Sequence, residues 1–503
     1  MKAPLMKAHL MYKDKDFDLS QPARFDEEDL SADLQLTPIF EAVRQRDSLV
    51  LEAFRAAFFT SLQKPQEITY RQKILQDCIR NPDVVRKLYA LTNETINRQQ
   101  KERLWFTTQF LANLFTNSVS MLQMLVEMLR QLREITETHF SGFTSEGFTN
   151  LFTILRDELD DDYFSLISEH LSELKFRDGT LISARLGHYN QGINYVLRRK
   201  KKHHFWRRWA FAPSFTLNLM DNNGGVDLTK RSHRALNEAA NALAQSADHV
   251  LGFFKMLRSE LAFYIGCLNL YEKLQKENQP LCWPLPVEPP NRRRSFQGLY
   301  DISLALTIEG DVTGNSLTAG EQSLYLITGA NQGGKSTFLR SVGQAQLMMQ
   351  CGMYVPAQHM ESHLCFSIFS HFRREEDKKM ISGKLDEEME RMSRIVDHIR
   401  QGSLILLNES FAATNEREGS EISRQIVTAL TDSGVEAFCV THLYEFANDL
   451  YQQKRPDITF LRAQRLSDGR RTFQILPGEP LKTSYGEDLY HKIFGGELTP
   501  VQR

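Results

Sequence analysis

The chain has 503 residues, of which 41% are hydrophobic and 25% are charged, and its formal net charge is −2. The length exceeds what one hydrophobic core usually organises, so two or three domains are expected. A charge near zero excludes a global attraction to nucleic acid, so any such contact must come from a local patch. Six scattered cysteines without a C-x-x-C pair exclude a disulfide framework and a cysteine zinc site, and the N-terminus lacks a secretory signal. A cytoplasmic protein is therefore expected.

The first half of the chain is predicted to be mainly helical. Residues 1–45 are interpreted as an irregular N-terminal arm, because clustered acidic residues and Pro22 interrupt any periodicity. From residue 46 to about 173, Leu, Phe, Glu, Arg and Gln are dense while Gly and Pro are few, which predicts helices. The uncharged stretch 104–126 contains too many polar side chains for a bilayer, so a buried helix and no membrane span is expected there.

Residues 178–221 are predicted to interrupt the helices with short strands or hairpins, because apolar positions and three glycines recur there. The same segment carries a basic cluster interleaved with aromatic residues, and its cations are Arg198, Arg199, Lys200, Lys201, Lys202, Arg207 and Arg208. Two interpretations stay open: phosphate contacts with nucleic acid, with Trp206 or Trp209 stacking on a base, or a solvated basic turn anchored by its tryptophans. We favour nucleic acid.

A long helix is predicted from about residue 227 to residue 278, where no proline occurs. At 1.5 Å per residue it would form a rod of roughly 70 Å, a length that suits a lever. Five prolines and Arg292-Arg293-Arg294 follow, and they predict a linker over residues 280–300. The helical domain is therefore assigned to residues 46–279, and the last domain to residues 301–503.

The last domain is predicted to be a parallel α/β nucleotide-binding domain, since apolar strands near 324–328, 404–407 and 437–441 alternate with helical stretches. The first strand runs into T-G-A-N-Q-G-G-K-S-T. In such a loop, backbone N–H groups wrap phosphates, Lys335 reaches the β and γ oxygens, and the Ser336 hydroxyl ligates Mg²⁺. The predicted binding residues for ATP or GTP are Gly329, Asn331, Gly333, Gly334, Lys335, Ser336 and Thr337.

Two further strands end in polar residues that suit hydrolysis. Glu409 is the candidate general base, because an attacking water needs a carboxylate within hydrogen-bond reach. Asn408 stands where a metal-assisting Asp is expected; its amide can accept a hydrogen bond from Mg²⁺-bound water but lacks the charge, so slow turnover is predicted. A lone histidine is more often structural, yet His442 at the carboxyl edge of a strand favours a γ-phosphate sensor.

Together these residues resemble the ATPase domain of the MutS mismatch-repair family. The glycine loop is similar to the family's T-G-x-N-x-G-G-K-S-T. Five further segments resemble family landmarks in the same order over about 160 residues: 351–357 with G-x-Y-V-P-A, 383–389 with S-T-F-x-x-E-M, Asn408-Glu409 with Asp-Glu, Thr441-His442 with Thr-His, and Ser484-Tyr485-Gly486 with S-Y-G.

The resemblance implies a multidomain fold, with a mainly α-helical core and lever followed by an α/β P-loop (ABC-like) ATPase domain. It implies ATP and Mg²⁺ as cofactors, ATP hydrolysis, and a homodimer in which each ATP lies under a signature segment of the partner. Here Ser382, Gly383 and Glu388 fall in that segment, with Gly383 in place of the family's serine. The family's G-R-G-T loop is replaced by Ser410-Phe-Ala-Ala-Thr414. Since neither a mismatch-reading domain nor a nuclease-like tail is found, the chain resembles a short-form member.

The expected function is ATP-driven dimer closure coupled to binding of mismatched or otherwise structured DNA, which we favour over RNA. Two rivals stay open. An ATPase acting on structured RNA or ribosomes fits the basic cluster equally, because phosphate contacts carry no sequence information. A nearly inactive ATP-gated scaffold is suggested by Asn408 and Gly383.

Overall fold

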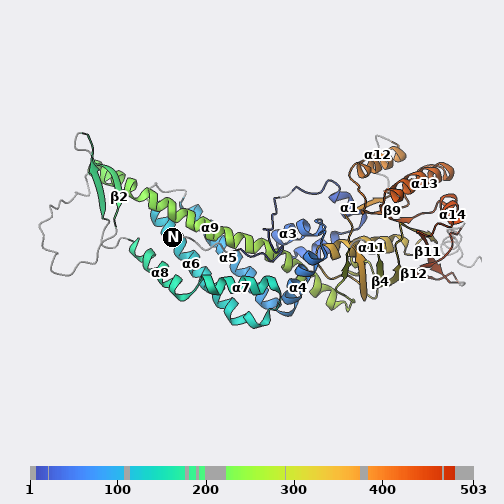
Figure 1. Ribbon diagram of the computed structural model, residues 1–503, viewed down its shortest axis with the longest axis horizontal. Coiled ribbons are helices and arrows are strands. Elements are labelled where there is room, and N and C mark those ends of the chain that lie inside the picture. Colours follow the sequence, from blue (N-terminus) through green and yellow to red (C-terminus); the bar gives the residue numbers. More distant parts are fainter. Residues whose placement is uncertain are drawn as a thin grey trace, which may run out of the picture. The chain divides into compact units, whose positions relative to one another are not determined.

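A computed structural model describes residues 7–20, 22–106, 114–175, 181–188, 192–198, 222–288, 291–373, 383–466 and 469–481 (Figure 1). Contacts within the chain define two compact units. One comprises Met1–His9 and Asn81–Leu261, and the other comprises Leu10–Arg80 and Ala262–Arg503. This division differs from the expected boundaries, because the first helices pack with the C-terminal half of the chain.

The first unit is helical, as expected for this part of the sequence. Its elements are α5 (Pro82–Phe106), α6 (Leu114–His139), the short 3₁₀ helix η2 (Phe140–Gly142), α7 (Glu146–Glu158), α8 (Asp161–Glu173) and the N-terminal part of α9 (Asn222–Lys276). Phe143, Phe148 and Phe152 form an aromatic core with ring centroids 4.5 to 5.6 Å apart. The Asp160 carboxylate caps α8 by accepting the Tyr163 N–H at 2.7 Å.

A β-hairpin and a long helix confirm two expectations for the middle of the chain. The antiparallel strands β1 (Ile182–Leu186) and β2 (Gly192–Leu197) fall in the segment where short strands were predicted. Helix α9 covers nearly all of the predicted rod. Among the helices in the described ranges, none has both the length and the apolar character that crossing a bilayer requires.

The second unit begins with four helices: α1 (Glu27–Asp33), α2 (Thr37–Arg44), α3 (Ser48–Phe58) and α4 (Pro65–Arg80). The first two lie where an irregular arm was expected, and the other two lie where helices were predicted. The acidic cluster that was interpreted as a break is the first turn of α1, where carboxylates favour a helix N-terminus. The Asp33 carboxylate fixes α1 to the rest of the unit by accepting from Ser370 Oγ at 2.8 Å and pairing with Arg391.

A six-stranded sheet forms the centre of the second unit and confirms the predicted α/β class. Its strands are β6 (Leu324–Gly329), β8 (Ile368–Phe372), β9 (Leu404–Asn408), β10 (Glu436–Val440), β11 (Ile458–Arg465) and β12 (Arg471–Pro477). The order is β12-β11-β6-β10-β9-β8, and every neighbouring pair is parallel except β11 and β12.

Helices cover both faces of this sheet, because successive strand residues point to opposite sides. The helices of this part are α10 (Ile302–Ala305), α11 (Lys335–Gln350), α12 (Lys384–Val396), α13 (Glu416–Asp432) and α14 (Tyr444–Gln452). On one face, Ile405 and Leu407 join a buried cluster with side chains of α12, α13 and α14. On the other, α11 approaches so closely that a Cβ on Gly343 would lie 2.5 Å from Leu406 Cδ1.

A second, four-stranded sheet replaces the expected linker. Its strands are β3 (Leu285–Val287), β4 (Arg294–Leu299), β5 (Asn315–Ala319) and β7 (His359–His363), in the order β3-β7-β4-β5. Pro286 is tolerated because β3 is an edge strand. Arg294 was placed in the predicted linker, yet it is fully buried beside Glu436, which neutralises its charge. The linker interpretation of residues 280–300 was therefore wrong.

Candidate functional site

The three predicted polar segments meet at one edge of the six-stranded sheet. Val440, at the end of β10, pairs with Ile327 of β6 and with Asn408 of β9. Since all three strands are parallel, the residues that follow them lie at the same edge, where α/β folds usually bind ligands. The glycine loop, Asn408-Glu409 and Thr441-His442 are thus brought together.

The glycine loop between β6 and α11 depends on glycine at defined positions. Gly329 and Gly334 have φ values of 111° and 89°, in the left-handed region that glycine adopts most easily. A Cβ on Gly333 would lie 2.8 Å from the Ala330 carbonyl oxygen. Gly334 is also the N-cap of α11, so the helix N-terminus with its free N–H groups opens onto the loop.

Lys335 turns back into the loop that precedes it. Its side chain is buried, and Nζ donates to the carbonyl oxygens of Gly329 and Ala330, each at 2.9 Å. Burial lowers the pKa of Lys335 to about 8; the Glu409 charge opposes this effect and the Arg471 charge adds to it. An anion in the loop would raise this pKa again, because it favours the charged ammonium.

Ser336 and Asn408 form a pair of oxygen groups below the loop. Ser336 Oγ donates to Asn408 Oδ1 at 2.9 Å. A hydroxyl and an amide oxygen are hard donors of the kind that Mg²⁺ prefers, so the pair fits this ion, although neither carries a charge. Of the other predicted loop residues, Asn331 is exposed and Thr337 Oγ1 accepts from Arg340 at 3.4 Å.

Glu409 and His442 form a half-exposed pair at the same edge. Glu409 Oε1 lies 2.7 Å from His442 Nε2, and each side chain is 28% exposed. The hydrogen bond from His442 lowers the pKa of Glu409, with help from the charges of Lys335 and Arg373 and against the effect of burial. The carboxylate is therefore ionised at neutral pH, as a general base must be.

The segment expected to act on a partner's nucleotide is described in part. Gly383 is the N-cap of α12 and Glu388 lies within that helix, whereas Ser382 lies outside the described residues. The Glu388 carbonyl oxygen lies 3.0 Å from Nε2 of His371.

His371 connects this segment to the candidate base, and no sequence pattern points to it. It is fully buried in β8, and its Nδ1 lies 2.8 Å from Oγ of Ser410, the residue after Glu409. Glu409 and Phe411, on either side of Ser410, have φ values of 53° and 62°. Only the pairing of β8 with β9 brings His371 to this turn, and the pairing is not visible in the sequence.

The antiparallel strand β12 adds two residues to the loop that the sequence also left unnoticed. Arg471 Nη1 donates to Oε1 of Gln332, inside the loop, at 3.0 Å. The backbone of Phe473 lies about 3.4 Å from where a Cβ of Gly334 would be. An antiparallel strand that follows five parallel ones has no sequence motif, so the alternation of polar and apolar residues in 471–477 was the available signal.

The predicted nucleic-acid residues fall mostly outside the described ranges. Arg198, at the end of the hairpin, is exposed, and its Nε donates to Ser183 Oγ at 2.9 Å. Arg199, Lys200, Lys201, Lys202, Arg207 and Arg208 lie outside the described residues, as does the Ser484-Tyr485-Gly486 segment.

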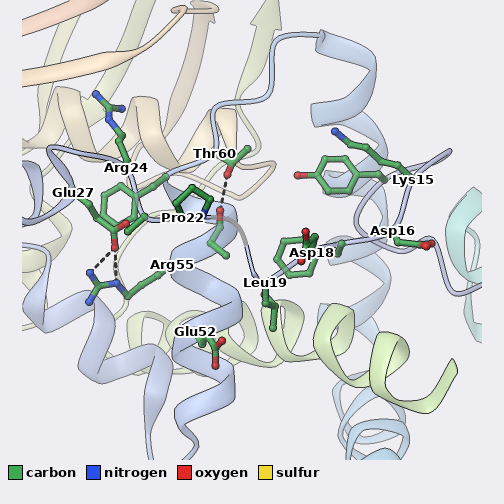
Figure 2. Close-up of a pocket in the computed structure, with 15 residues that line it drawn as sticks. Lys15, Asp16, Asp18, Leu19, Pro22, Arg24, Glu27, Glu52, Arg55 and Thr60 are labelled. Carbon is green, nitrogen blue, oxygen red and sulfur yellow. Dashed lines mark hydrogen bonds and ion pairs between the residues drawn. The ribbon is translucent and has the colours of Figure 1, made fainter. Parts of the chain in front are cut away.

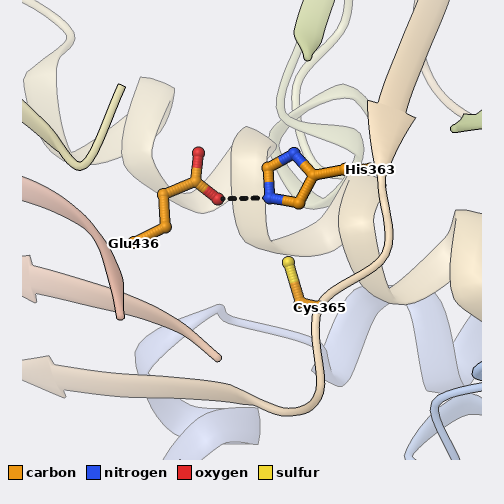
Figure 3. A group of neighbouring side chains, drawn as sticks. All are labelled: His363, Cys365 and Glu436. Carbon is orange, nitrogen blue, oxygen red and sulfur yellow. Dashed lines mark ion pairs between the residues drawn. The ribbon is translucent and has the colours of Figure 1, made fainter. Parts of the chain in front are cut away.

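A group of potential metal ligands lies at the opposite end of β10 (Figure 3). Ligand atoms of His363, Cys365 and Glu436 all lie within 4.8 Å of one another. Arg294 already supplies the positive charge there, because its Nε and Nη2 donate to the two Glu436 oxygens at 3.0 and 2.7 Å. We therefore interpret the group as a buried ion network and not as a metal site.

The ion network fixes the protonation of its members. Burial alone would raise the pKa of Glu436, but Arg294 and His363 outweigh it and lower the pKa to about 2. Burial likewise opposes the charge on His363, yet hydrogen bonds with Cys365 and Glu436 raise its pKa to about 9. At neutral pH the network holds two cations around one carboxylate.

A separate cavity of about 480 Å³ lies between the segment 12–24 and α3 (Figure 2). Two of its cations have partners inside the cavity: Arg55 Nε donates to Glu27 at 2.8 Å, and Lys15 Nζ lies 4.1 Å from the centre of the Tyr12 ring. None of its lining residues belongs to the glycine loop or to the strand ends described above.

Comparison with known proteins gives two family matches. Residues 63–277 match the MutS2 N-terminal domain, and residues 325–490 match MutS domain V.

MutS protein homolog 4 of Mus musculus is 30% identical over 152 residues, which cover 30% of this chain and 16% of that protein. DNA mismatch repair protein MutS of Thermus aquaticus is 32% identical over 169 residues, 33% of this chain and 20% of that protein. Endonuclease MutS2 of Brevibacillus brevis is 28% identical over 163 residues, 32% of this chain and 20% of that protein. Each match thus spans a fifth or less of the relative.

Proposed function

The chain is a MutS family protein, and on that premise we propose that it is a P-loop ATPase that couples ATP-driven dimer closure to DNA binding. One observation carries the ATPase part of this proposal. Lys335, the Ser336–Asn408 pair and the Glu409–His442 pair all converge at the carboxyl edge of one parallel sheet. A cation, a hydroxyl and an ionised carboxylate are the groups that phosphoryl transfer to water requires.

Binding would begin with the loop and the start of α11. The N–H groups at the helix N-terminus would hold phosphate oxygens, and the Lys335 ammonium would move from the Gly329 and Ala330 carbonyls onto the β and γ oxygens. Ser336 would hold Mg²⁺ directly and Asn408 would hold it through a bound water, and the ion would neutralise developing phosphate charge. The hydrogen bond with His442, helped by the charges of Lys335 and Arg373, keeps the pKa of Glu409 low and its carboxylate ionised.

Hydrolysis would depend on Glu409. Its carboxylate would accept a proton from the attacking water, while His442 Nε2 holds it by the 2.7 Å hydrogen bond. His442 would also report whether the γ-phosphate is present. Because Asn408 is neutral where a carboxylate would bind Mg²⁺ more strongly, we expect slow turnover.

Calorimetric titration with ATP and Mg²⁺ tests the proposal directly. We expect Lys335→Ala to weaken ATP binding by about a hundredfold, since a buried charge-assisted phosphate contact is lost. Lys73→Ala, which removes an exposed lysine on α4, is the matched control and should bind ATP like the wild type. No binding heat for the wild type, or equal affinity of Lys335→Ala, would refute the nucleotide site.

DNA is the proposed second ligand, supported by the family matches and by the basic cluster that follows the hairpin in the sequence. Changing Lys200, Lys201 and Lys202 together to Ala should weaken duplex binding and reduce its salt dependence by about three counterions. A fluorescence titration at several salt concentrations measures this slope. An unchanged slope would remove the cluster from the interface, and tighter binding of folded RNA than of mismatched duplex would favour an RNA ligand.

A further inference from the structure

Arg471 is placed at the glycine loop by strand β12. Its Nη1 donates to the side chain of Gln332 at 3.0 Å, and two residues later the backbone of Phe473 packs on Gly334. The strand therefore contacts the loop twice, which defines where the Arg471 side chain lies. Its Nε is buried, and no hydrogen-bond partner for it is found among the described residues.

The charges around the loop indicate what this guanidinium could bind. At the loop, Arg471 donates to the amide oxygen of Gln332, which carries no charge and so does not neutralise the guanidinium. The turn after Glu409, from Ser410 to Thr414, contains no cation. A triphosphate with Mg²⁺ keeps excess negative charge, which Lys335 alone does not balance.

We propose that Arg471 is a second phosphate-binding cation of the same subunit, which leaves Gln332 and contacts the terminal phosphate of a bound nucleoside triphosphate. The inference rests on the proposed nucleotide site. A guanidinium presents several N–H donors in one plane, so it can bind two phosphate oxygens at once. The Arg471 charge also lowers the pKa of Lys335, so the two cations act on the same space. Arg471 would therefore favour triphosphate over diphosphate.

The test compares nucleotide affinities of the full chain with Arg471→Ala, Arg471→Lys and the control Arg470→Ala. Arg470 is the exposed neighbour of Arg471, so its removal changes the net charge equally. Titration with a non-hydrolysable ATP analogue should show about tenfold weaker binding for Arg471→Ala, and titration with ADP a loss of under about threefold. Arg471→Lys should recover most of the triphosphate preference, and Arg470→Ala should match the wild type.

Three outcomes would overturn the proposal. In the first, Arg471→Ala keeps the wild-type ratio of ATP-analogue to ADP affinity, and in the second, Arg470→Ala changes this ratio as much as Arg471→Ala does. In the third, Arg471→Lys fails to restore the ratio although its melting temperature equals that of the wild type. A purely structural role for Arg471 predicts equal losses for both nucleotides together with a lower melting temperature. Failure of the nucleotide site itself is distinct, because the wild type would then bind neither nucleotide.

Discussion

Strand β10 carries charged or polar groups at both of its ends, and the two ends differ in how those groups are satisfied. At its start, Glu436 is buried and enclosed by Arg294 and His363, which together compensate its charge. Beyond its other end, His442 meets Glu409 with both side chains 28% exposed. Buried charges that compensate one another are costly to separate, whereas partly exposed charges remain available to a ligand. The comparison therefore separates a structural network from a candidate active site on one five-residue strand.

The largest expected effect is on ATP hydrolysis, at the partly exposed end of β10 where Glu409 meets His442, which we call the open end. Glu409→Gln removes the proposed base but keeps the shape of the side chain, so ATP should still bind. We expect single-turnover hydrolysis to fall by about a thousandfold, as for other general bases. Quenched-flow measurement with radiolabelled ATP gives this rate. Equal rates for wild type and variant would leave the chain as an ATP-gated scaffold instead of an enzyme.

At the buried end of β10, which holds Glu436 and which we call the closed end, the expected effect is on protein stability and not on hydrolysis. Glu436→Gln leaves Arg294 as a buried charge without a carboxylate partner, which should lower the free energy of unfolding by about 3 to 5 kcal/mol. Urea denaturation measures the change. ATP affinity per folded molecule should be unchanged, which distinguishes this variant from Glu409→Gln.

The pH dependence of the folding stability gives a second test of the ion network around Glu436. The pKa of His363 is raised to about 9 in the folded protein, so its stabilising contribution is complete below about pH 6.5 and is lost as the pH rises through 9. The wild type should therefore lose stability over this interval. Glu436→Gln should lose less, because one of the two groups that raise the pKa of His363 is gone; an identical pH profile would contradict the network.

The smallest expected effect concerns the metal-assisting position. Asn408→Asp adds a carboxylate beside Ser336, which should tighten Mg²⁺ binding and raise hydrolysis by roughly tenfold, since a charged oxygen ligand is stronger than an amide. Measuring turnover against Mg²⁺ concentration tests this. If Asn408→Asp is slower than the wild type at every Mg²⁺ concentration, Asn408 has a role that a carboxylate cannot fill.

The open end of β10 was largely predictable and the closed end was not. Gly329, Lys335 and Glu409 follow apolar strands directly, so local sequence and the rule for parallel sheets were enough to bring them together. Arg294 and Glu436 are 142 residues apart. Charged residues near prolines resemble a solvated linker until the partner is known, so only the tertiary pairing revealed Arg294 as buried.

Tertiary pairing also explains why the sequence did not reveal two residues beside the candidate site. His371 reaches the candidate base through the register of β8 and β9, and Arg471 reaches the loop through an antiparallel strand. Neither has a motif of its own. In α1 the acidic residues were visible, but they were interpreted as a break, although carboxylates at that position favour a helix start.

The turn after β9 holds two ordinary residues, Glu409 and Phe411, in a backbone conformation that side chains with a Cβ usually avoid. Each costs roughly 1 kcal/mol, and Ser410 between them is held by His371. A backbone fixed in this way restricts the positions that the carboxylate of Glu409 can occupy. The turn therefore lowers the stability of the protein slightly but holds one acidic group in a defined orientation, as expected for a residue that must contact a single water molecule.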